Sequence, residues 1–472
     1  MDAIMRKTKI VATIGPASEK PAVLRRLIEG GLDVVRLNFS HGTHEQHGRN
    51  IDAIREISDE VAIMLDTQGP EIRLGVMEQP RTLKTDDTVT LTTGDASSAE
   101  MLPVAHPGFL EHIHTGDEIL LDDGNVALVV EQVDDVAVCR VRHGGMVGSQ
   151  QSVNVPGRDL DLQAPTDKDR RDIRYGVEKD VDFVAASFVE SAGEVREIRE
   201  LLRSHGSHAG VISKIESMQA LENIDAIIAA ADGVMVARGD LGVEIPASDV
   251  PLTQKNIIRK CNARGTPVIT ATQMLESMTE HPRATRAEAS DVANAVLDGT
   301  DAVMLSEETA IGSYPVEAFM FMAEVLEKVE MFFRDHAHRT VDGGSGSVAD
   351  IISKNVWRAC NEIDVDYIVA HTSSGSTARN ISRYRPMTDI IAFTNTPTVR
   401  RQLRLVWGVR PYHIAFKEYF DDLIYDTTSF LKNRGEVADD DMLVITAGVP
   451  NSVTGITNLM EIRRVGSILG AA

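Results

Sequence analysis

Cysteine is scarce in this chain, and long apolar runs are missing from it. The 472 residues include 3 cysteines, Cys139, Cys261 and Cys360, which lie far apart with neither metal-ligand spacing nor a disulfide framework. No apolar run approaches the roughly 20 residues that a membrane-spanning helix needs. Residues 1–7 hold no apolar stretch before a cleavage site, so no secretory signal is visible. We therefore expect buried thiols, no membrane partner and a reducing, cytoplasmic location.

Positive charge is also in short supply. The 71 Asp and Glu residues outnumber the 48 Lys and Arg residues, and the formal net charge is −23. This balance argues against non-specific binding to nucleic acid or to anionic membranes. A chain this acidic that handles anionic substrates must concentrate positive charge locally, through Lys, Arg or metal ions. Adaptation to high salt is an alternative source of the same balance.

Eight short apolar runs, most of them followed by an amphipathic helical pattern, predict a barrel. Runs that are apolar on both faces are typical of buried parallel strands. Eight β-then-α units are what a closed (β/α)8 TIM barrel requires. The predicted strands are Lys9–Ile14, Asp33–Leu37, Val61–Leu65, Asp182–Ala186, Gly210–Ser213, Gly233–Ala237, Pro267–Ala271 and Asp301–Leu305.

The gap between the third and fourth predicted strands is unusually long and predicts an inserted domain. The turn signal Asp122-Asp123-Gly124-Asn125 lies within it. We expect a small β-barrel lid, hinged at Gly69-Pro70 and near Pro156-Gly157. The segments that alternate apolar and polar residues are 88–93, 118–121, 126–133 and 136–141.

A run of linker composition, 342–347, precedes a third region of the chain. Four strands alternating with helical patterns predict an open α/β domain there. The predicted fold class is therefore α/β. The (β/α)8 barrel takes residues 1–69 and 163–335, the inserted lid 70–162, and the C-terminal α/β domain 336–472. The strands predicted in this last domain are Tyr367–Ala370, Asp389–Phe393, Tyr412–Phe416 and Met442–Thr446.

The carboxyl ends of barrel strands are where such enzymes carry their chemistry. Lys214 and Glu216 end the fifth predicted strand, and Asp240 follows the sixth. Two carboxylates there form the hard oxygen set that suits Mg²⁺ or Mn²⁺. Lys214 can neutralise a phosphoryl group in transfer. A Lys–Glu pair at a strand end is more often a plain salt bridge, but Asp240 on the next strand favours the metal site.

Other strand ends carry groups with two interpretations each. The backbone of Gly239-Asp240-Leu241-Gly242 can bind a carboxylate or phosphate, or it forms an ordinary turn. Thr272 can relay a proton from water, or it caps the following helix. Arg36 and Arg73 suit polyphosphate recognition. A set of mostly neutral oxygens beside them can bind a monovalent cation or orient the arginines: Asn38, Ser40, Asp66 and Thr67.

The familiar phosphate-binding motifs are absent. The chain has no Gly-x-x-x-x-Gly-Lys-Ser/Thr loop and no Gly-x-Gly-x-x-Gly after its first predicted strand. Any nucleotide is therefore bound in another way.

Along essentially its whole length, the chain resembles pyruvate kinase. That family has a barrel, an inserted β lid and a C-terminal α/β domain, and it usually forms a homotetramer. The resemblance implies transfer of the phosphoryl group of phosphoenolpyruvate to ADP, giving pyruvate and ATP, the final step of glycolysis. The matching stretches are Thr8–Ser18 (TKIVATIGPAS), Arg36–Gly42 (RLNFSHG), Asp66–Arg73 (DTQGPEIR), Asp232–Pro246 (DGVMVARGDLGVEIP), Val268–Met278 (VITATQMLESM), Thr285–Thr309 (TRAEASDVANAVLDGTDAVMLSEET) and Ser382–Pro386 (SRYRP).

The resemblance implies roles for the residues at the strand ends. Glu216 and Asp240 would hold the divalent ion that grips phosphoenolpyruvate, whose carboxylate would meet the backbone of Gly239 and Asp240. Lys214 would stabilise the phosphoryl group in transfer. Arg36 would also touch that group, and the enolate would be protonated near Thr272. The remaining sets implied are the K⁺ ligands Asn38, Ser40, Asp66 and Thr67, and the ADP side, with a second Mg²⁺, at Asn38, His41, Arg73 and Asp123.

A loop in the third region predicts an allosteric anion site. Thr372-Ser373-Ser374-Gly375-Ser376-Thr377 follows a predicted strand and precedes a helix with Arg379, so hydroxyl and N–H groups could cradle a phosphate. The family binds a sugar phosphate or a nucleoside monophosphate in this region, which implies a phosphorylated effector. A capped loop without a ligand is the alternative.

Departures from the family pattern fall mainly on the nucleotide side. Gln68 and Gln151 stand where lysines are usual, so we expect weak ADP binding. Glu71 and Thr67 stand where members that need no monovalent cation carry Lys and Leu, so we expect a requirement for K⁺. The alternative is that Glu71 only pairs with an arginine. Two further departures are Ala284 for Pro and Glu307 for Gly.

Two other functions fit parts of the pattern. A pyruvate-enolate lyase or aldolase would use one Mg²⁺ on a similar barrel without a nucleotide. The inserted lid and the two arginines argue against it. A non-catalytic metabolite sensor would be expected to lack Lys214, Glu216 or Asp240, and all three are present.

Overall fold

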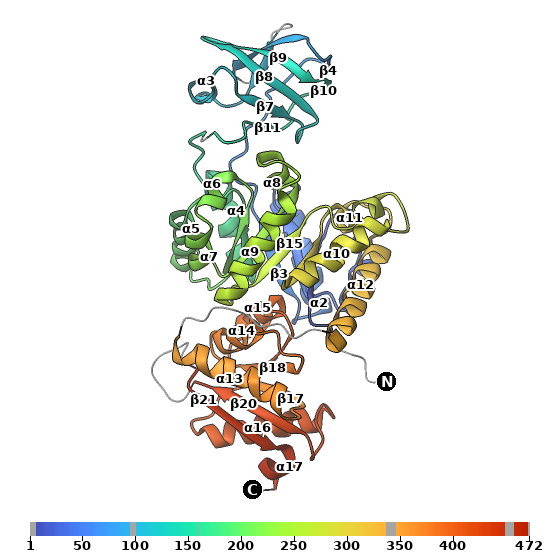
Figure 1. The fold of residues 1–472 in the computed structure, drawn as a ribbon, viewed down its shortest axis with the longest axis vertical. Coiled ribbons are helices and arrows are strands. Elements are labelled where there is room, and N and C mark those ends of the chain that lie inside the picture. The colour runs from blue at the N-terminus through green and yellow to red at the C-terminus, as the bar shows by residue number, and fades with distance from the viewer. Residues whose placement is uncertain (1–5, 95–100, 159, 337–345, 449–456, 471–472) are drawn as a thin grey trace.

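The computed structural model describes residues 6–94, 101–158, 160–336, 346–448 and 457–470. Figure 1 shows three parts in a row along the long axis of the molecule. A strand-rich lid lies at one end, a barrel in the middle and an α/β domain at the other end. Within the described ranges, no helix combines the length and the apolar character that crossing a bilayer requires.

The middle part is a closed barrel of parallel strands in the order β1-β16-β15-β14-β13-β12-β3-β2. All the predicted barrel strands are confirmed, with ends that differ from the prediction by at most two residues. Their bounds are Lys9–Thr13 (β1), Val34–Asn38 (β2), Ala62–Asp66 (β3), Phe183–Ala186 (β12), Gly210–Ile215 (β13), Gly233–Ala237 (β14), Val268–Ala271 (β15) and Ala302–Leu305 (β16).

Helices follow the barrel strands and cover the barrel from outside (Figure 1). The longer ones are Pro21–Glu29 (α1), His44–Ile57 (α2), Asp167–Glu178 (α4), Ala192–Ser204 (α5), Val250–Arg264 (α9), Arg286–Asp298 (α10) and Pro315–His336 (α12). Shorter ones are Met218–Glu222 (α6), Ile224–Ala230 (α7), Arg238–Glu244 (α8), Glu307–Ala310 (α11) and the 3-10 helix Glu276–Thr279.

Alternation along each strand builds two separate apolar layers. On β1, Ile10 and Ala12 pack in the large cluster under the helices, whereas Val11 packs inside the barrel with Met64 and Met235. Successive side chains of a strand point to opposite faces, and in this barrel both faces are covered. This explains why the strands are apolar throughout rather than alternating with polar residues.

The lid follows β3 and is a strand-rich unit of its own, as predicted. A six-stranded sheet has the order β11-β7-β8-β9-β5-β6, and β10 pairs with β4 beside it. The predicted turn at Asp122–Asn125 joins β7 to β8, and Asp122, Asp123 and Gly124 take positive φ there. The elements are Arg81–Leu83 (β4), Thr88–Thr93 (β5), Met101–Val104 (β6), Phe109–His112 (α3), Glu118–Leu121 (β7), Val126–Val133 (β8), Ala137–His143 (β9), Gly145–Val147 (β10) and Val153–Asn154 (β11).

The C-terminal domain is an open sheet of order β19-β18-β17-β20-β21, in which β21 alone runs antiparallel to its neighbour. The predicted strand Tyr412–Phe416 lies three residues too late, because β19 spans Val409–His413 and includes Pro411. Strand β19 is at the edge of the sheet, where a proline is tolerated. The elements are Val348–Glu362 (α13), Tyr367–His371 (β17), Ser376–Ser382 (α14), Asp389–Thr394 (β18), Pro397–Gln402 (α15), Leu403–Leu405 (3-10), Val409–His413 (β19), Phe420–Asn433 (α16), Met442–Ala447 (β20), Leu459–Arg464 (β21) and Val465–Leu469 (α17).

Ion pairs join this domain to the amino-terminal end of the barrel. Arg385 Nη1 lies 3.0 Å from Asp301 Oδ1, just before β16, and Arg401 Nε lies 2.5 Å from Asp182 Oδ1, just before β12. Lys7 reaches Asp389 at 2.7 Å. The C-terminal domain therefore covers one end of the barrel and leaves the carboxyl ends of the strands facing the lid.

Candidate active site

Lys214 stands in a buried polar cluster at the carboxyl end of the barrel. Its Nζ lies 2.8 Å from Glu216 Oε1 and 3.3 Å from Asp66 Oδ1, and it donates to Ser187 Oγ at 2.7 Å. The Lys214 side chain is 11% exposed and each carboxylate 1%. Three neighbouring strands, β13, β3 and β12, thus bring one ammonium and two carboxylates together in a nearly dry site.

Arg36 adds a second cation beside Asp66. Arg36 Nε lies 2.5 Å from Asp66 Oδ2, and Nη1 donates to Thr13 Oγ1 at 3.0 Å. Burial would raise the pKa of Asp66, but the charges of Arg36 and Lys214 hold that pKa below its ordinary value. Asp66 therefore stays ionised and fixes the positions of both cations.

The other carboxylate of the cluster, Glu216, is disfavoured in its charged form by burial. Burial raises the pKa of Glu216 to about 7, with the charge of Lys214 opposing the rise and that of Asp240 adding to it. Burial also acts to lower the pKa of Lys214, but Asp66, Glu216 and Asp240 together raise it above its ordinary value. Lys214 is therefore charged at neutral pH, and the carboxylates around it carry an excess of negative charge.

Glu216 and Asp240 have the chemistry of a divalent metal site. Glu216 Oε2 accepts a hydrogen bond from Phe188 N–H at 2.6 Å, which fixes its orientation, and Asp240 is exposed at the start of α8. A divalent cation between them would relieve their mutual repulsion. Within the described part of the chain, no three His, Cys, Asp or Glu side chains gather as a ligand set. Two carboxylates are what Mg²⁺ commonly takes from a protein when a substrate phosphate completes its shell.

Thr272 and Gly239 contact each other at the ends of β15 and β14. Gly239 N–H donates to Thr272 Oγ1 at 2.8 Å, and that hydroxyl donates to the Ala271 carbonyl at 2.7 Å. The Gly239 N–H, predicted to meet the substrate carboxylate, is therefore bonded to the Thr272 hydroxyl, near which the enolate is predicted to be protonated.

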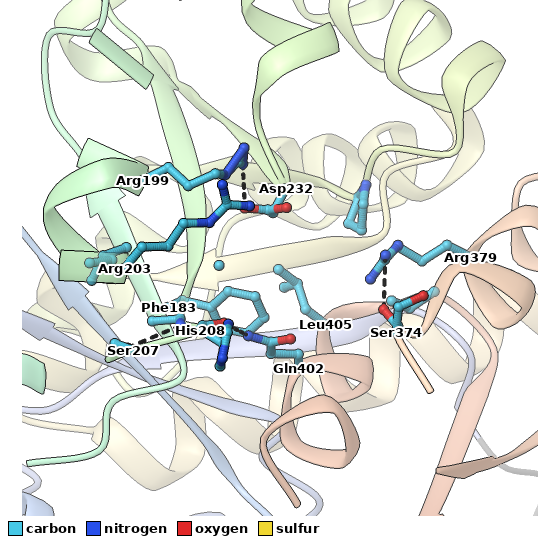
Figure 2. Close-up of a pocket in the computed structure, with 15 residues that line it drawn as sticks. Phe183, Arg199, Arg203, Ser207, His208, Asp232, Ser374, Arg379, Gln402 and Leu405 are labelled. Carbon is cyan, nitrogen blue, oxygen red and sulfur yellow. Dashed lines mark hydrogen bonds and ion pairs between the residues drawn. The ribbon is translucent and has the colours of Figure 1, made fainter. Parts of the chain in front are cut away.

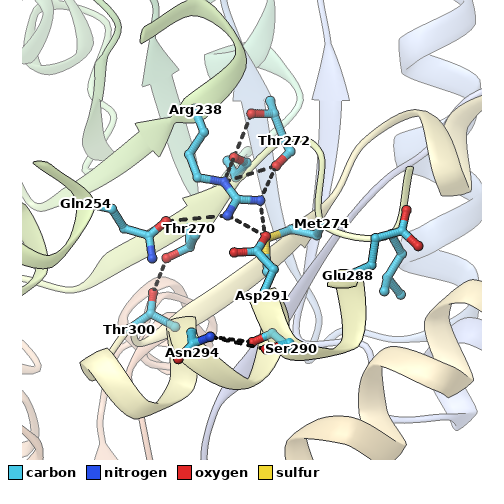
Figure 3. Close-up of polar contacts among 12 residues, drawn as sticks. Arg238, Gln254, Thr270, Thr272, Met274, Glu288, Ser290, Asp291, Asn294 and Thr300 are labelled. Atoms are coloured by element: carbon cyan, nitrogen blue, oxygen red, sulfur yellow. Dashed lines mark hydrogen bonds and ion pairs between the residues drawn. The ribbon is translucent and has the colours of Figure 1, made fainter. Parts of the chain in front are cut away.

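Arg238, a strand-end residue without a predicted role, holds Thr272 in place (Figure 3). Its Nη2 donates to the Thr272 carbonyl at 2.6 Å, and its Nε contacts the Ala271 and Thr272 carbonyls at 3.2 Å each. On the far side, Nη1 lies 2.6 Å from Asp291 Oδ2 on α10. The only sequence signal for Arg238 was its position between a strand and a glycine, because its partners Thr272 and Asp291 lie 34 and 53 residues away in sequence.

A cleft of about 400 Å³ separates this end of the barrel from the lid. Asp240 and Glu244 line it from α8, and Arg73, Asp123 and Gln151 line it from the lid side. Two of the four residues predicted for the nucleotide thus lie in one cleft with Asp240. The other two, Asn38 and His41, are not part of its lining.

Arg73, one of the two arginines predicted to recognise polyphosphate, is already paired within the lid side of the cleft. Arg73 Nη2 lies 2.5 Å from Glu71 Oε2, and Arg73 Nη1 donates to the Gln150 carbonyl at 2.7 Å. The alternative expectation, that Glu71 pairs with an arginine, agrees with this contact. Asp123 in turn accepts from Ser152 Oγ at 2.7 Å.

The predicted K⁺ ligands lie together at the carboxyl end of the barrel, where β2 and β3 end. Asn38 and Asp66 are register partners on β2 and β3, and Asn38 Oδ1 accepts from Ser40 N–H at 3.1 Å. Thr67 follows Asp66 and uses its carbonyl to accept from Ser187 Oγ at 2.7 Å. Four oxygen-bearing residues with one formal charge therefore lie next to the Arg36–Asp66 pair.

Matches to known families agree with this arrangement. Residues 5–319 match the model described as the pyruvate kinase barrel domain, and residues 350–463 match the one described as the pyruvate kinase alpha/beta domain. The chain belongs to the pyruvate kinase family. Its reaction is the transfer of the phosphoryl group of phosphoenolpyruvate to ADP, and pyruvate kinases generally require a divalent metal ion and K⁺.

Individual pyruvate kinases are similar over nearly the whole chain. The enzyme of Geobacillus stearothermophilus is 47% identical over 476 residues, which cover 98% of this chain and 81% of the relative. That of Staphylococcus aureus (strain MRSA252) is 44% identical over 477 residues with the same coverage. The crystal structure of a pyruvate kinase from Cryptosporidium parvum superposes with a TM-score of 0.90 at 36% identity, covering 98% of this chain and 96% of that one.

The predicted effector loop lies in the C-terminal domain of this pyruvate kinase, between β17 and α14. Its last two residues, Ser376 and Thr377, already belong to α14, and Gly375 takes φ +80° just before it. Arg379 Nη2 donates to the Ser374 carbonyl at 3.1 Å. Thr377 Oγ1 is bonded to Thr457 Oγ1 at 2.8 Å, so one of the predicted hydroxyls already has a partner.

Proposed function

We propose that Lys214 is the residue that stabilises the phosphoryl group during its transfer to ADP. The observation that carries the proposal is its ammonium, buried between Glu216 and Asp66 at the strand ends. A transferring phosphoryl group spreads charge over its oxygens, and catalysis consists of positioning and of offsetting that charge. In a nearly dry site a fixed cation acts more strongly than it would in water.

Glu216 and Asp240 are the residues proposed to hold Mg²⁺ or Mn²⁺. Their mutual repulsion and their hard oxygens support this assignment. When bound, the ion offsets charge on the phosphoryl oxygens. Asp66 pairs with both Lys214 and Arg36, so the two cations keep their positions beside the proposed metal site.

On the substrate side, the Gly239 and Asp240 backbone is proposed to meet the carboxylate of phosphoenolpyruvate. Binding there would exchange the Gly239 N–H bond to Thr272 Oγ1 for one to the substrate. To pass a proton to the enolate carbon, the Thr272 hydroxyl would turn away from the Ala271 carbonyl, and it would recover a proton from water. Arg36 is proposed to touch the phosphoryl group from the neighbouring strand.

The lid is proposed to carry the nucleotide. Arg73 and Asp123 line the cleft that faces Asp240, and this supports roles for them in binding ADP with its own Mg²⁺. Asn38 and His41 would join them when the lid closes over the strand ends. Closure would also exclude water, which otherwise competes with ADP for the phosphoryl group.

Three further features are proposed from the family pattern. K⁺ would bind at Asn38, Ser40, Asp66 and Thr67, and a phosphorylated effector would bind at the loop Thr372–Thr377. The chain would assemble as a homotetramer in the cytoplasm. Calorimetry with fructose 1,6-bisphosphate, AMP and ribose 5-phosphate tests the effector loop. If none of the three produces heat of binding, the proposal of an effector site is wrong.

The test of the metal proposal is an assay with phosphoenolpyruvate and ADP from which Mg²⁺ and K⁺ are omitted in turn. Asp240→Asn should raise the Mg²⁺ concentration needed for half-maximal rate. Asp249→Asn, an exposed aspartate after the same helix and outside the cleft lining, is the matched control. An unchanged Mg²⁺ requirement in Asp240→Asn would contradict the assignment.

A further inference from the structure

A second cavity, of about 150 Å³, lies between the barrel and the C-terminal domain (Figure 2). The barrel supplies residues at the starts of its strands, among them Phe183, Gly210 and Pro267. The C-terminal domain supplies Ser374 and Arg379 from the β17–α14 region, Gln402 from the end of α15, and Leu405 and Val406 from the segment after it. The cavity is therefore at the amino-terminal end of the barrel, away from the Lys214 cluster.

The cavity is cationic although the chain is strongly acidic. Arg199 and Arg203 enter from α5, and Arg379 enters from α14 on the facing wall (Figure 2). The lining contains one carboxylate, Asp232, which lies 2.6 Å from Arg199 Nη2. Arg203 has no hydrogen-bond or ion-pair partner among the described residues. Two guanidinium groups are thus left without a counter-charge in a chain of net charge −23.

Arg379 differs from other arginines where the two domains meet. Arg385, Arg400 and Arg401 pair with Asp301, Asp59 and Asp182 at 3.0, 2.9 and 2.5 Å. Arg379 makes one hydrogen bond, to the Ser374 carbonyl, and has no carboxylate within ion-pair distance among the described residues. Burial lowers the pKa of its guanidinium below the ordinary value, with the charge of Asp232 opposing. A charge kept partly out of water without a partner is costly, so its retention calls for a ligand.

We propose that this cavity binds a small phosphate monoester, whose dianion lies between Arg203 and Arg379 and bridges α5 to α14. A planar guanidinium presents paired N–H donors that match phosphate oxygens, and two of them suit a dianion. Phe183, Leu405 and Val406 provide apolar wall for a short carbon chain. A cavity of about this volume accommodates a molecule the size of benzene, which excludes a whole nucleotide.

The site is distinct from the proposed effector loop. Of the residues in Thr372–Thr377, Ser374 alone lines the cavity, and the rest of the lining comes from the barrel, from α14 and from residues 402–406. A ligand that contacts both domains at once favours the arrangement in which they are docked as seen here. Occupation of the cavity therefore raises the resistance of the docked molecule to thermal unfolding.

Calorimetry and thermal melting with glycerol 3-phosphate test the proposal, with glycerol as the neutral control. Because hydrogen bonds to charged groups contribute strongly, Arg203→Gln should weaken binding roughly ten- to hundredfold. Arg379→Gln should do the same. Arg196→Gln removes the same charge from an exposed position of α5 outside the cavity and should bind as the unaltered protein does.

The Arg203 variant tests the proposal even if Arg379→Gln is unstable. Because Arg203 is exposed, its replacement leaves the fold intact. Binding that is equally strong in Arg203→Gln comes from the active site or from the effector loop and overturns the proposal. Absence of binding to the unaltered protein overturns it as well, and so does equal binding of glycerol.

Discussion

The Arg238 guanidinium donates to the Thr272 carbonyl at 2.6 Å, while Thr272 takes φ +64°, a region that β-branched residues rarely occupy. Gln273 follows at φ +54°. Such a backbone persists only where its surroundings hold it. The fork of Arg238, anchored on Asp291, holds the turn that presents the Thr272 hydroxyl to the substrate side.

Replacing Arg238 should therefore affect turnover more than binding. We expect Arg238→Met to lower kcat between about ten- and a hundredfold, because a displaced catalytic group loses that much for a shift near 1 Å. KM for ADP should stay within a factor of about two, since no nucleotide residue contacts Arg238. Arg238→Lys, which can make one of these bonds, should recover part of kcat. A variant that melts earlier with unchanged kcat would show a purely structural role.

Gln151 offers a gain-of-function test on the lid. It lines the cleft, and its Oε1 accepts from Gly148 N–H at 2.7 Å. Gln151→Lys should lower KM for ADP about two- to fivefold, the range of an exposed charge pair, with little change for phosphoenolpyruvate. Gln132→Lys adds the same charge on an exposed lid strand away from the cleft and should change neither constant. Equal behaviour of the two variants would exclude a nucleotide contact at residue 151.

Dependence on K⁺ follows from the charges near the strand ends. Glu71 neutralises Arg73 at 2.5 Å, so no lysine or free arginine at residue 71 or 73 can replace a monovalent cation. Activity should fall steeply when tetramethylammonium is the only monovalent cation. Glu71→Lys should regain activity there, whereas Glu71→Gln, which only removes charge, should not. Full activity of the unaltered enzyme without Na⁺ and K⁺ would show that the cation is dispensable.

Glu244 makes stability depend on pH. Burial raises its pKa from an ordinary 4.5 to about 7, with a hydrogen bond from Gly157 N–H opposing the rise and the charge of Glu190 adding to it. Between pH 4.5 and about 7, Glu244 is therefore protonated in the folded state but ionised in the unfolded state. Its contribution to the stability of the fold consequently falls as the pH rises through this range.

Glu244→Gln keeps the acceptor for Gly157 and removes the charge. Its Tm should exceed that of the unaltered protein at pH 8, and the difference should vanish toward pH 4. Glu178→Gln, which replaces an exposed glutamate at the end of α4, should show no such trend. A Tm difference that is the same at both pH values would rule out a buried charge as its cause.

The barrel was predictable because its strands are apolar on both faces and recur at regular intervals. The same regularity located Lys214, Glu216 and Asp240, since each stands at the end of such a strand. Partners remote in sequence were not predictable. Asp291, which anchors Arg238, lies 53 residues from it on a helix whose amphipathic pattern says nothing of its neighbours. The position of strand β19 was also missed: it contains Pro411, and the sequence does not show that this strand lies at a sheet edge, where a proline is tolerated.

The Arg203–Arg379 cavity shows a second limit. Arg203 belongs to an ordinary amphipathic helix, and Arg379 follows a loop predicted to bind an anion by itself. Nothing in either segment indicates that they face each other across a domain boundary. Only the docking of the two domains brings their charges together.

The measurement that bears most directly on this account is the yield of pyruvate and ATP from phosphoenolpyruvate and ADP in the unaltered enzyme and in Lys214→Met. Phosphoenolpyruvate binding is followed separately by calorimetry. We predict equal amounts of both products from the unaltered enzyme. Lys214→Met should lose transfer by at least about a thousandfold, because its charge acts mainly in the transition state, while largely retaining phosphoenolpyruvate binding. Near-normal turnover in Lys214→Met, or pyruvate released without ATP by the unaltered enzyme, would contradict the account.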